Sequence, residues 1–314
     1  MFDIQADGTA TLALSPSTDF GRRRIVPVVY IVNDALTRPG FQPRAAAASL
    51  FDSLQGWSGW SELQVDCDWT PSTRAAYFAL LDNLGKKLHA EGKSLSATIR
   101  LHQVKYRSQT GVPPVDRGML MAYNLLPPTD AGEKSSILDD GELAGYLPSM
   151  KSYPLPLDTA LPVFGWVAQW EGPRLLGLID DAGAPAQLSG PGFAPMGPGR
   201  YVAVSRGSLL GRSVEKGDVL VIDRPGFDAV LKAADKLHAA LRWESRSVAL
   251  YHLDSQTIET FSGGDDAQIE AIYGALGARR DRGGSAPRVR TRALGRRGRL
   301  CRERPTGMLL VVGG

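Results

Sequence analysis

The stretch Glu62-Leu63-Gln64-Val65-Asp66-Cys67-Asp68-Trp69-Thr70 decides the fold of this chain. Apolar and polar residues alternate along most of it, which predicts a short buried strand that ends in two carboxylates and an aromatic residue. Thr70 followed by Pro71 then predicts the start of a helix, with the threonine oxygen as a cap and proline at the first helical position. A strand that leads directly into a helix, with acids at its carboxyl end, is typical of the sites where β/α enzymes carry out their chemistry.

The rest of the chain alternates strand and helix patterns, at intervals of about 25–35 residues. Further strand patterns cover residues 25–32, 95–101, 118–124, 157–166, 218–222 and 247–253, and helical patterns cover residues 44–54, 227–241 and 266–276. After Thr70, apolar residues recur at helical spacing and predict one buried stripe, made of Tyr77, Leu80, Leu81, Leu84 and Leu88. This order predicts parallel β/α units rather than a sandwich of antiparallel strands.

We therefore expect an α/β protein with a TIM-like (β/α) barrel over residues 25–278. Six of these strand patterns are clear, whereas a closed barrel needs eight strands. We therefore expect the barrel to be incomplete at its N-terminal end, where residues 1–24 form an irregular segment. Residues 168–217 are rich in Gly and Pro and indicate an insertion within a loop, with short hairpin-like pieces. A doubly wound open sheet is the alternative, but no Gly-rich phosphate loop follows any strand to favour it.

The composition limits the classes of protein that fit this chain. Its 314 residues are 43% hydrophobic and 22% charged, which supports a sizeable core and argues against wholesale disorder. No apolar run approaches the roughly 20 residues that span a bilayer. Met1-Phe2-Asp3-Ile4 lacks the features of a signal peptide, so a cytoplasmic location is expected for the chain as written. A longer N-terminus with an export signal would instead make the protein periplasmic or lipid-anchored.

Metal and cofactor chemistry finds no support in the sequence. Cys67 lies in the predicted core strand and Cys301 in a basic segment, which indicates neither a disulfide framework nor a metal cluster. The four histidines are scattered without the spacing of a zinc site. We expect no metal and no cofactor.

The basic charge is concentrated near the C-terminus. Residues 279–304 contain eleven Arg and two acids, a local charge of +9 that leaves the rest of the chain at −6 under the net charge of +3. Such a run predicts a disordered segment over residues 279–314. It could bind nucleic acid through phosphates, but the absence of interleaved aromatic residues makes nucleic-acid binding the weaker interpretation.

Several blocks of the sequence carry a resemblance to a known family. They are Glu62-Leu63-Gln64-Val65-Asp66-Cys67-Asp68-Trp69, Leu95-Ser96-Ala97-Thr98-Ile99-Arg100-Leu101-His102-Gln103, Gly111-Val112-Pro113-Pro114-Val115-Asp116-Arg117-Gly118-Met119-Leu120-Met121, Tyr153-Pro154-Leu155-Pro156-Leu157-Asp158 and Ala160-Leu161-Pro162. On these blocks, over about residues 25–255, the chain resembles an uncharacterised bacterial family, domain of unknown function 3142. The resemblance implies a TIM-barrel fold akin to that of glycoside hydrolases.

The chain also resembles, more weakly, chitinase-type hydrolases of the retaining, substrate-assisted kind. Their fourth strand ends in Asp-x-x-Asp-x-Asp-x-Glu; Asp66 and Asp68 match its middle, Leu63 takes the first Asp position and Thr70 the final Glu position. Met121-Ala122-Tyr123-Asn124 is similar to the Met-x-Tyr-Asp of their sixth strand, and Ala160-Leu161-Pro162-Val163-Phe164-Gly165 is similar to their seventh. This order makes residues 25–32 the third strand. That Glu is the general acid of the family, so Thr70 argues against hydrolysis by that mechanism.

Asp66 and Asp68 are the central candidates for a site. They lie two residues apart on a predicted strand, so their side chains project to the same face, the barrel interior near its mouth. Two close carboxylates repel each other, which raises one pKa as acid–base catalysis requires. The structural alternative is that one of them only caps the following helix or pairs with Arg100.

The other candidates lie near the ends of the following strands. Arg100 and Tyr123 could position a sugar, with Asn124 and His102 adding polar contacts, although an ion pair for Arg100 and a packed core position for Tyr123 are equally compatible. Trp69 and Trp166 could each be an aromatic platform that stacks on a sugar ring, or a residue packed in the core.

These residues, together with the resemblance, predict a glycoside hydrolase-like protein that acts on or binds an oligosaccharide or polysaccharide at the carboxyl ends of the strands. Asp68 would serve as acid or electrostatic partner with Asp66 adjusting its pKa, and Asp116 would be the first candidate to replace the missing Glu. The rival interpretation is a catalytically inactive carbohydrate-binding barrel that uses the same pocket. Thr70 separates the two, since restoring Glu there should produce hydrolysis only if the surrounding geometry is already catalytic.

Overall fold

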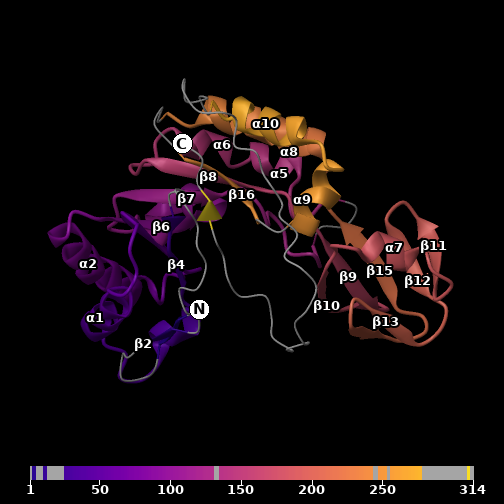
Figure 1. The fold of residues 1–314 in the computed structure, drawn as a ribbon, viewed down its shortest axis with the longest axis horizontal. Coiled ribbons are helices and arrows are strands. Elements are labelled where there is room, and N and C mark those ends of the chain that lie inside the picture. The colour runs from indigo at the N-terminus through magenta and orange to yellow at the C-terminus, as the bar shows by residue number, and fades with distance from the viewer. Residues whose placement is uncertain are drawn as a thin grey trace.

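A six-stranded parallel sheet is the centre of the molecule (Figure 1). A computed structural model of the chain describes residues 2–4, 10–12, 25–130, 134–242, 247–252, 255–277 and 310–311. The spatial order of the strands, β16-β8-β7-β6-β5-β4, follows their order in the sequence. Their bounds are β4 (Val28–Tyr30), β5 (Glu62–Asp66), β6 (Ser94–Arg100), β7 (Arg117–Met121), β8 (Leu157–Pro162) and β16 (Val248–Tyr251).

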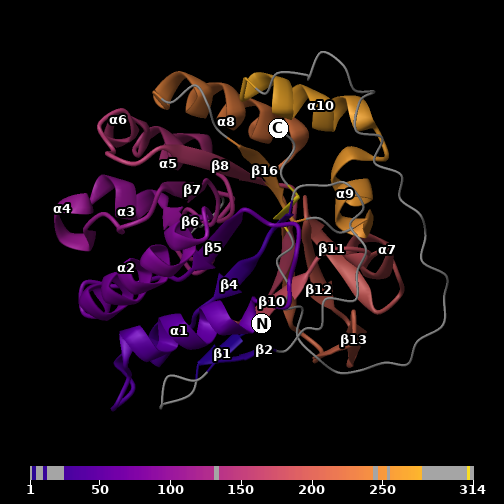
Figure 2. The same ribbon diagram turned by 60° about the vertical axis from the view of Figure 1, so that its left-hand side comes forward.

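Helices connect successive strands and cover the outer face of this curled sheet (Figure 2). Each connection returns the chain so that the next strand is the parallel neighbour of the last, which is the construction of one part of a β/α barrel. The connecting helices are η1 (Asn33–Thr37), α1 (Pro43–Ser53), α2 (Arg74–Ala90), α3 (Leu101–Lys105), α4 (Arg107–Thr110), α5 (Asp140–Ala144), α6 (Leu147–Met150) and α8 (Phe227–Ala240). Two more, α9 (Ser255–Ser262) and α10 (Asp266–Ala275), follow β16.

The two faces of β5 show how the sequence builds the core. Leu63 and Val65 are fully buried and belong to the large hydrophobic cluster between sheet and helices. Gln64 and Asp66 alternate with them and face the inside of the curl. The apolar stripe predicted for α2 is confirmed, because Tyr77, Leu80, Leu81, Leu84 and Leu88 are all 0% exposed. That helix begins at Arg74 rather than at Thr70, because residues 70–73 form a turn in which the Thr73 hydroxyl accepts from the Thr70 amide at 2.9 Å.

The barrel is a half-barrel in the part of the chain that the structure describes. The parallel sheet has two edges, β4 and β16, and its strand order never reverses, which also rules out the doubly wound alternative. Near the N-terminus, β1 (Phe2–Ile4) and β2 (Ala10–Leu12) pair with each other and not with the parallel sheet. A two-residue strand, β17 (Leu310–Val311), pairs antiparallel with β3 (Ile25–Val26). The disorder predicted for residues 279–314 otherwise lies outside the described residues.

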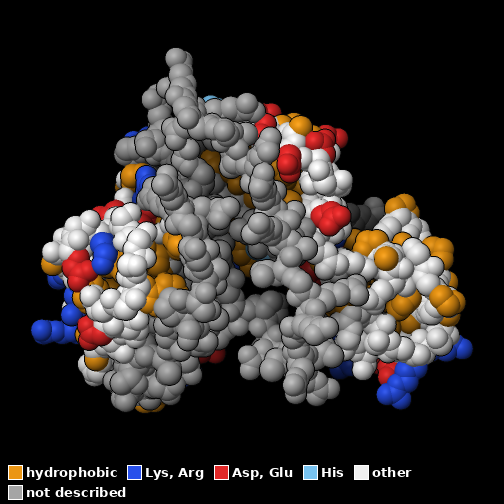
Figure 3. All heavy atoms as spheres, viewed as in Figure 1, with side chains coloured by type: hydrophobic (Ala, Val, Ile, Leu, Met, Phe, Trp, Pro, Cys, Tyr) orange, Lys and Arg blue, Asp and Glu red, His pale blue; other side chains and the backbone are white. Residues whose placement is uncertain are grey.

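Residues 166–223 form a second sheet where the sequence indicates a loop insertion. Its five antiparallel strands run in the order β10-β9-β15-β12-β11 and enclose a separate hydrophobic cluster that includes Val167, Leu209 and Leu220. Scattered apolar side chains on its surface (Figure 3) are ordinary for a folded unit. The elements are β9 (Trp166–Glu171), β10 (Arg174–Asp180), α7 (Ala184–Leu188), β11 (Phe193–Gly197), β12 (Arg200–Ala203), β13 (Gly207–Leu209), β14 (Arg212–Val214) and β15 (Val219–Asp223).

This sheet changes the place of two predicted strands. The strand predicted over 157–166 ends at Pro162 as β8, and Trp166 instead opens β9 of the insertion. The strand predicted over 218–222 is β15, which pairs with β9 and β12 and takes no part in the half-barrel. The sequence patterns predict both strands correctly. The sheet that each strand joins depends on antiparallel partners elsewhere in the chain.

Buried polar contacts attach the insertion to the half-barrel. Arg224 Nε donates to Asp181 Oδ2 at 2.6 Å, and both side chains are largely buried. Asp223, at the end of β15, accepts from the amide and hydroxyl of Ser136 at 2.8 and 2.5 Å. A Cβ added at Gly165 would lie 2.2 Å from Asp181 Oδ2, so this junction requires glycine.

Candidate functional site at the carboxyl ends of the strands

Asp66 and Asp68, here called the acid pair, stand at the carboxyl end of β5 with different partners. The Thr98 hydroxyl, on the neighbouring strand β6, donates to Asp66 Oδ1 at 2.6 Å. Arg100, the last residue of β6, donates from Nε to Asp68 Oδ1 at 2.6 Å and from Nη2 to Asp68 Oδ2 at 2.9 Å. The two carboxylates therefore lie at one edge of the sheet, and Arg100 engages both oxygens of one of them.

The environment of Asp66 favours its protonated form. Burial raises the pKa of Asp66, and the Asp68 charge adds to this effect, while the Thr98 hydrogen bond and the Arg100 charge oppose it. Asp68 is more exposed, with 53% of its side-chain surface accessible, and its charge is balanced by Arg100. The sequence predicted a raised pKa within the acid pair; in the structure desolvation is the larger cause and mutual repulsion a smaller one.

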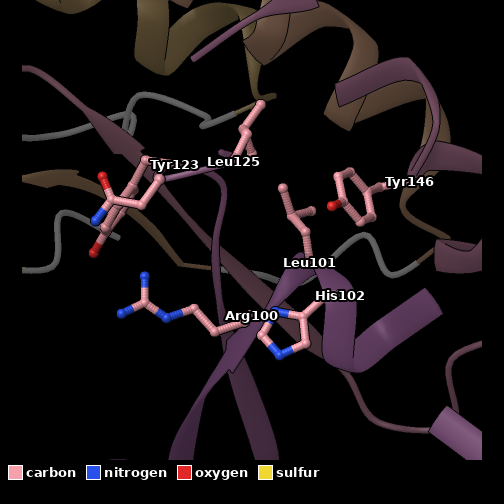
Figure 4. A pocket seen from close by; sticks show the side chains of 7 residues that line it. Arg100, Leu101, His102, Tyr123, Leu125 and Tyr146 are labelled. Carbon is pink, nitrogen blue, oxygen red and sulfur yellow. The ribbon is translucent and has the colours of Figure 1, made fainter. Parts of the chain in front are cut away.

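A small pocket lies beside the acid pair (Figure 4). In this view the Arg100 side chain extends to the side on which Tyr123 lies, whereas His102 and Tyr146 lie on the opposite side. The pocket's volume of about 30 Å³ leaves room for ordered water. The lining residues are Arg100, Leu101, His102, Tyr123, Asn124, Leu125 and Tyr146.

His102 is held at this pocket by a short helix, and Asn124 by a left-handed backbone conformation. The strand predicted over 95–101 ends at Arg100, and His102 lies on the short helix α3 that follows. Burial lowers the pKa of His102 and thereby favours the neutral imidazole, which can both donate and accept a hydrogen bond. Asn124 has φ of 55°, a left-handed conformation that asparagine tolerates better than most residues.

An aromatic cluster next to the pocket consists of Tyr123, Phe164, Trp166 and Tyr251. Tyr123 stacks on Tyr251 with ring centroids 5.2 Å apart and an interplanar angle of 11°, and Phe164 meets both rings edge-on. Trp166 lies against Phe164 at 5.7 Å. Among the described residues, the buried Tyr123 hydroxyl and Trp166 Nε1 have no hydrogen-bond partner. Both atoms are buried, so two polar groups lie beneath the surface of this edge without a protein partner.

The structure places two predicted site residues elsewhere. Trp69 is 2% exposed, donates from its indole to the Thr110 carbonyl at 2.9 Å and stacks on Tyr77. It is therefore a core residue and not an aromatic platform. Asp116 accepts from the Leu95 amide at 2.7 Å, at the amino end of β6. Leu95 and Thr98 are three residues apart, a rise of roughly 10 Å. Asp116 is therefore at the opposite end of the sheet from Asp66 and cannot supply the missing carboxylate.

Three residues that the sequence analysis did not select also lie at this edge. Tyr30, the last residue of β4, pairs in register with Asp66. Tyr251 ends β16, and the charges of Asp66 and Asp180 both raise the pKa of its phenol, in addition to the larger effect of burial. Tyr30 and Tyr251 lie near the ends of the strands predicted over residues 25–32 and 247–253, and this position could have identified them as candidates. Asp180 gave no such signal, because it belongs to the insertion.

Several solved structures with a similar fold are named as chitinases or spore cortex-lytic enzymes. A chitinase from Chromobacterium violaceum has a TM-score of 0.52 at 16% sequence identity, covering 88% of this chain and 90% of that one. The spore cortex-lytic enzyme SleL of Bacillus megaterium gives a TM-score of 0.52 at 13% identity, covering 82% of this chain but only 64% of its own length. A putative sporulation-specific glycosylase, YdhD of Bacillus subtilis, gives 0.52 at 14% identity, covering 76% of this chain and 87% of that chain.

These likenesses show a glycoside hydrolase-like fold of the chitinase type. No protein-family model matches the chain, and no curated protein is significantly similar to it, so the resemblance to domain of unknown function 3142 is without support from these comparisons. Among the described residues, no helix is long and apolar enough to cross a membrane. In the same part of the chain, no group of three His, Cys, Asp or Glu side chains is arranged to hold a metal ion.

Proposed function

We propose that this protein binds an oligosaccharide across the carboxyl ends of the half-barrel strands, at the acid pair and the aromatic cluster. The observation that carries the proposal is the two-point pairing of Asp68 with Arg100 directly beside Asp66, at an edge where Tyr123 and Trp166 retain unpartnered polar groups. A few fixed polar groups among aromatic rings is the usual construction of a small-molecule site.

Binding without turnover is favoured by the surroundings of Thr70. Its hydroxyl lies 2.8 Å from that of Ser72, within the turn before α2, and so has its partner outside the acid pair. Asp68 is neutralised by Arg100, and Asp116 lies at the other end of the sheet. A glycosidase needs two carboxyl groups on either side of the scissile bond, whereas both members of the acid pair lie within three residues at the end of β5.

Hydrolysis is the second candidate, and one observation favours it. The raised pKa of Asp66 is the property of a general acid. The second carboxylate would then be Asp180, whose charge acts on Tyr251 from the insertion side. The chitinases and cortex-lytic enzymes among the structural neighbours make chitin oligosaccharides the first ligands to test.

Calorimetric titration with chitin oligosaccharides, followed by cello- and xylo-oligosaccharides, tests the proposal. We expect the native chain to bind one class, and Asp68→Asn to weaken binding about tenfold, or about 1.4 kcal/mol. Asp116→Asn is the matched control, since the same chemical change at the far end of the sheet should leave the affinity unchanged.

Two results would overturn this proposal. The native chain binding none of these saccharides would remove the carbohydrate function, and equal losses in the two variants would place the site away from the acid pair. Release of a chromogenic aglycone from chitin oligosides, abolished by Asp66→Asn, would establish the second candidate instead.

A further inference from the structure

The carboxyl end of β4 carries two exposed apolar side chains at the inner edge of the half-barrel. Val29 and Ile31 are 0% and 2% exposed and pack into the large core, whereas Tyr30 and Val32 are 45% and 53% exposed. This alternation is that of a strand with one face on the helices and one face open. The open side chains include an aromatic ring, at the end of the sheet where the acid pair lies.

Tyr30 is the cross-strand neighbour of Asp66. The two residues are in register between β4 and β5, and the Ile31 amide donates to the Asp66 carbonyl at 2.8 Å. In-register residues of neighbouring strands project to the same face about 5 Å apart. Burial and the charges of Asp66 and Asp68 raise the pKa of Tyr30, so its phenol remains a neutral hydrogen-bond donor.

The other tyrosine, phenylalanine and tryptophan rings of the site are less exposed than that of Tyr30. Tyr123 and Tyr251 cover each other at 5.2 Å, and Phe164 closes on their edges. Trp69 is in the core, covered by Tyr77. A pyranose ring has an apolar C–H face and a rim of hydroxyl groups, and an exposed aromatic ring beside carboxylates and a guanidinium matches both features.

We infer that Tyr30 is a stacking platform, on which one sugar ring of the bound oligosaccharide lies while its hydroxyl groups reach the acid pair and Arg100. This inference rests on the proposed function and assigns it a specificity-determining residue. It also gives the half-barrel edge strand a role, since Tyr30 would hold the sugar on the β4 side of the acid pair.

Tyr30→Ala and Tyr30→Phe test the platform by titration with the oligosaccharide that binds the native chain, starting from chitin tetraose. We expect Tyr30→Ala to weaken binding about tenfold and Tyr30→Phe to retain most of the affinity, because the phenyl face remains. Tyr106→Ala is the matched control; Tyr106 is 47% exposed but lies at the end of α3, away from β4. In proton NMR spectra of the complex, ring-proton shifts of the sugar caused by an aromatic face should disappear in Tyr30→Ala only.

The outcomes separate this inference from the function on which it depends. If the native chain binds no saccharide, the proposed function fails and the platform fails with it. If the native chain and Tyr30→Ala bind equally, or Tyr30→Phe loses as much affinity as Tyr30→Ala, the platform alone is overturned. Equal losses in Tyr30→Ala and Tyr106→Ala would also overturn it, since the effect would not be specific to β4.

Discussion

Arg100 and Asp68 form a two-point ion pair that joins the ends of two neighbouring strands. Nε and Nη2 of the arginine lie 2.6 and 2.9 Å from the two carboxylate oxygens, so the planar guanidinium and the carboxylate are held in one orientation. Arg100 ends β6, while Asp68 lies two residues beyond β5. The charge of the same arginine also opposes the burial that raises the pKa of Asp66, so one side chain acts on both members of the acid pair.

Arg100→Lys should separate the geometry of this pair from its charge. Lysine keeps the positive charge but cannot make two parallel hydrogen bonds. Because Asp68 is about half exposed, we expect unfolding in urea to show a loss of only about 0.5–1 kcal/mol. Arg174→Lys, in an exposed pair with Glu171, is the control and should leave the free energy of unfolding unchanged. If Arg174→Lys lost as much free energy of unfolding as Arg100→Lys, the Arg100–Asp68 pair would be no more stabilising than an exposed ion pair.

Asp66 should make the protein less stable as the pH rises. Its folded-state pKa lies above the unfolded value of 3.8, so the folded state binds more protons between these two values. The free energy of unfolding should therefore fall from pH 3.8 upward through the folded pKa and then level off. Asp66→Asn should remove this contribution and be the more stable of the two at neutral pH, as measured by urea unfolding across the pH range. If carbon-13 NMR gave a pKa at or below 3.8 for the Asp66 carboxyl group in the folded protein, the expectation would be contradicted.

Thr70→Glu should not by itself create a hydrolase. The Thr70 hydroxyl is turned toward Ser72 in the turn before α2, and Asp68 is engaged by Arg100. A glutamate at this position would start from the turn before α2, beside Ser72 and Thr73. We expect no release of chromophore from a chitin oligoside above the rate of the native chain. Measurable turnover would show that the local geometry is already catalytic and would favour the hydrolase candidate.

Gly165→Ala should weaken the attachment of the insertion. The added methyl group would overlap Asp181 Oδ2 and disturb the buried pair with Arg224, which costs about 2 kcal/mol for overpacking of this kind. Thermal unfolding measures the loss. Gly192→Ala is the matched control within the insertion, because a Cβ there meets no atom within 4 Å. If both variants unfold at the native temperature, the junction is more adaptable than the contacts indicate.

Much of the half-barrel was predictable because its signals are local. The stripe from Tyr77 to Leu88 repeats at helical spacing, and the alternation around Leu63 and Val65 fixes which side of β5 meets the helices. The position of the acid pair at a strand end followed from the same alternation. Asp116 could also have been placed correctly, since it precedes its strand and so belongs at the amino end of the sheet.

The insertion was less predictable because its strands pair at long range. β9 pairs with β15 from about fifty residues further along the chain, as well as with the adjacent β10, and these two pairings place Trp166 outside the half-barrel. Trp69 illustrates the same difficulty for a single residue. A tryptophan after a strand fits a platform or a core equally well in sequence, and its burial depends on Tyr77 and on the Thr110 carbonyl at the end of α4.

The sequence by itself determined that strands and helices alternate, which faces of β5 and α2 are buried, and that two carboxylates end a strand. These properties follow from side-chain periodicity within one element. Only the tertiary structure decided that Arg100 pairs with Asp68, that Asp66 is desolvated, and that Tyr30 lies open beside it. Each of these depends on register between strands that are separated in the chain, and register is fixed by the packing of the whole sheet.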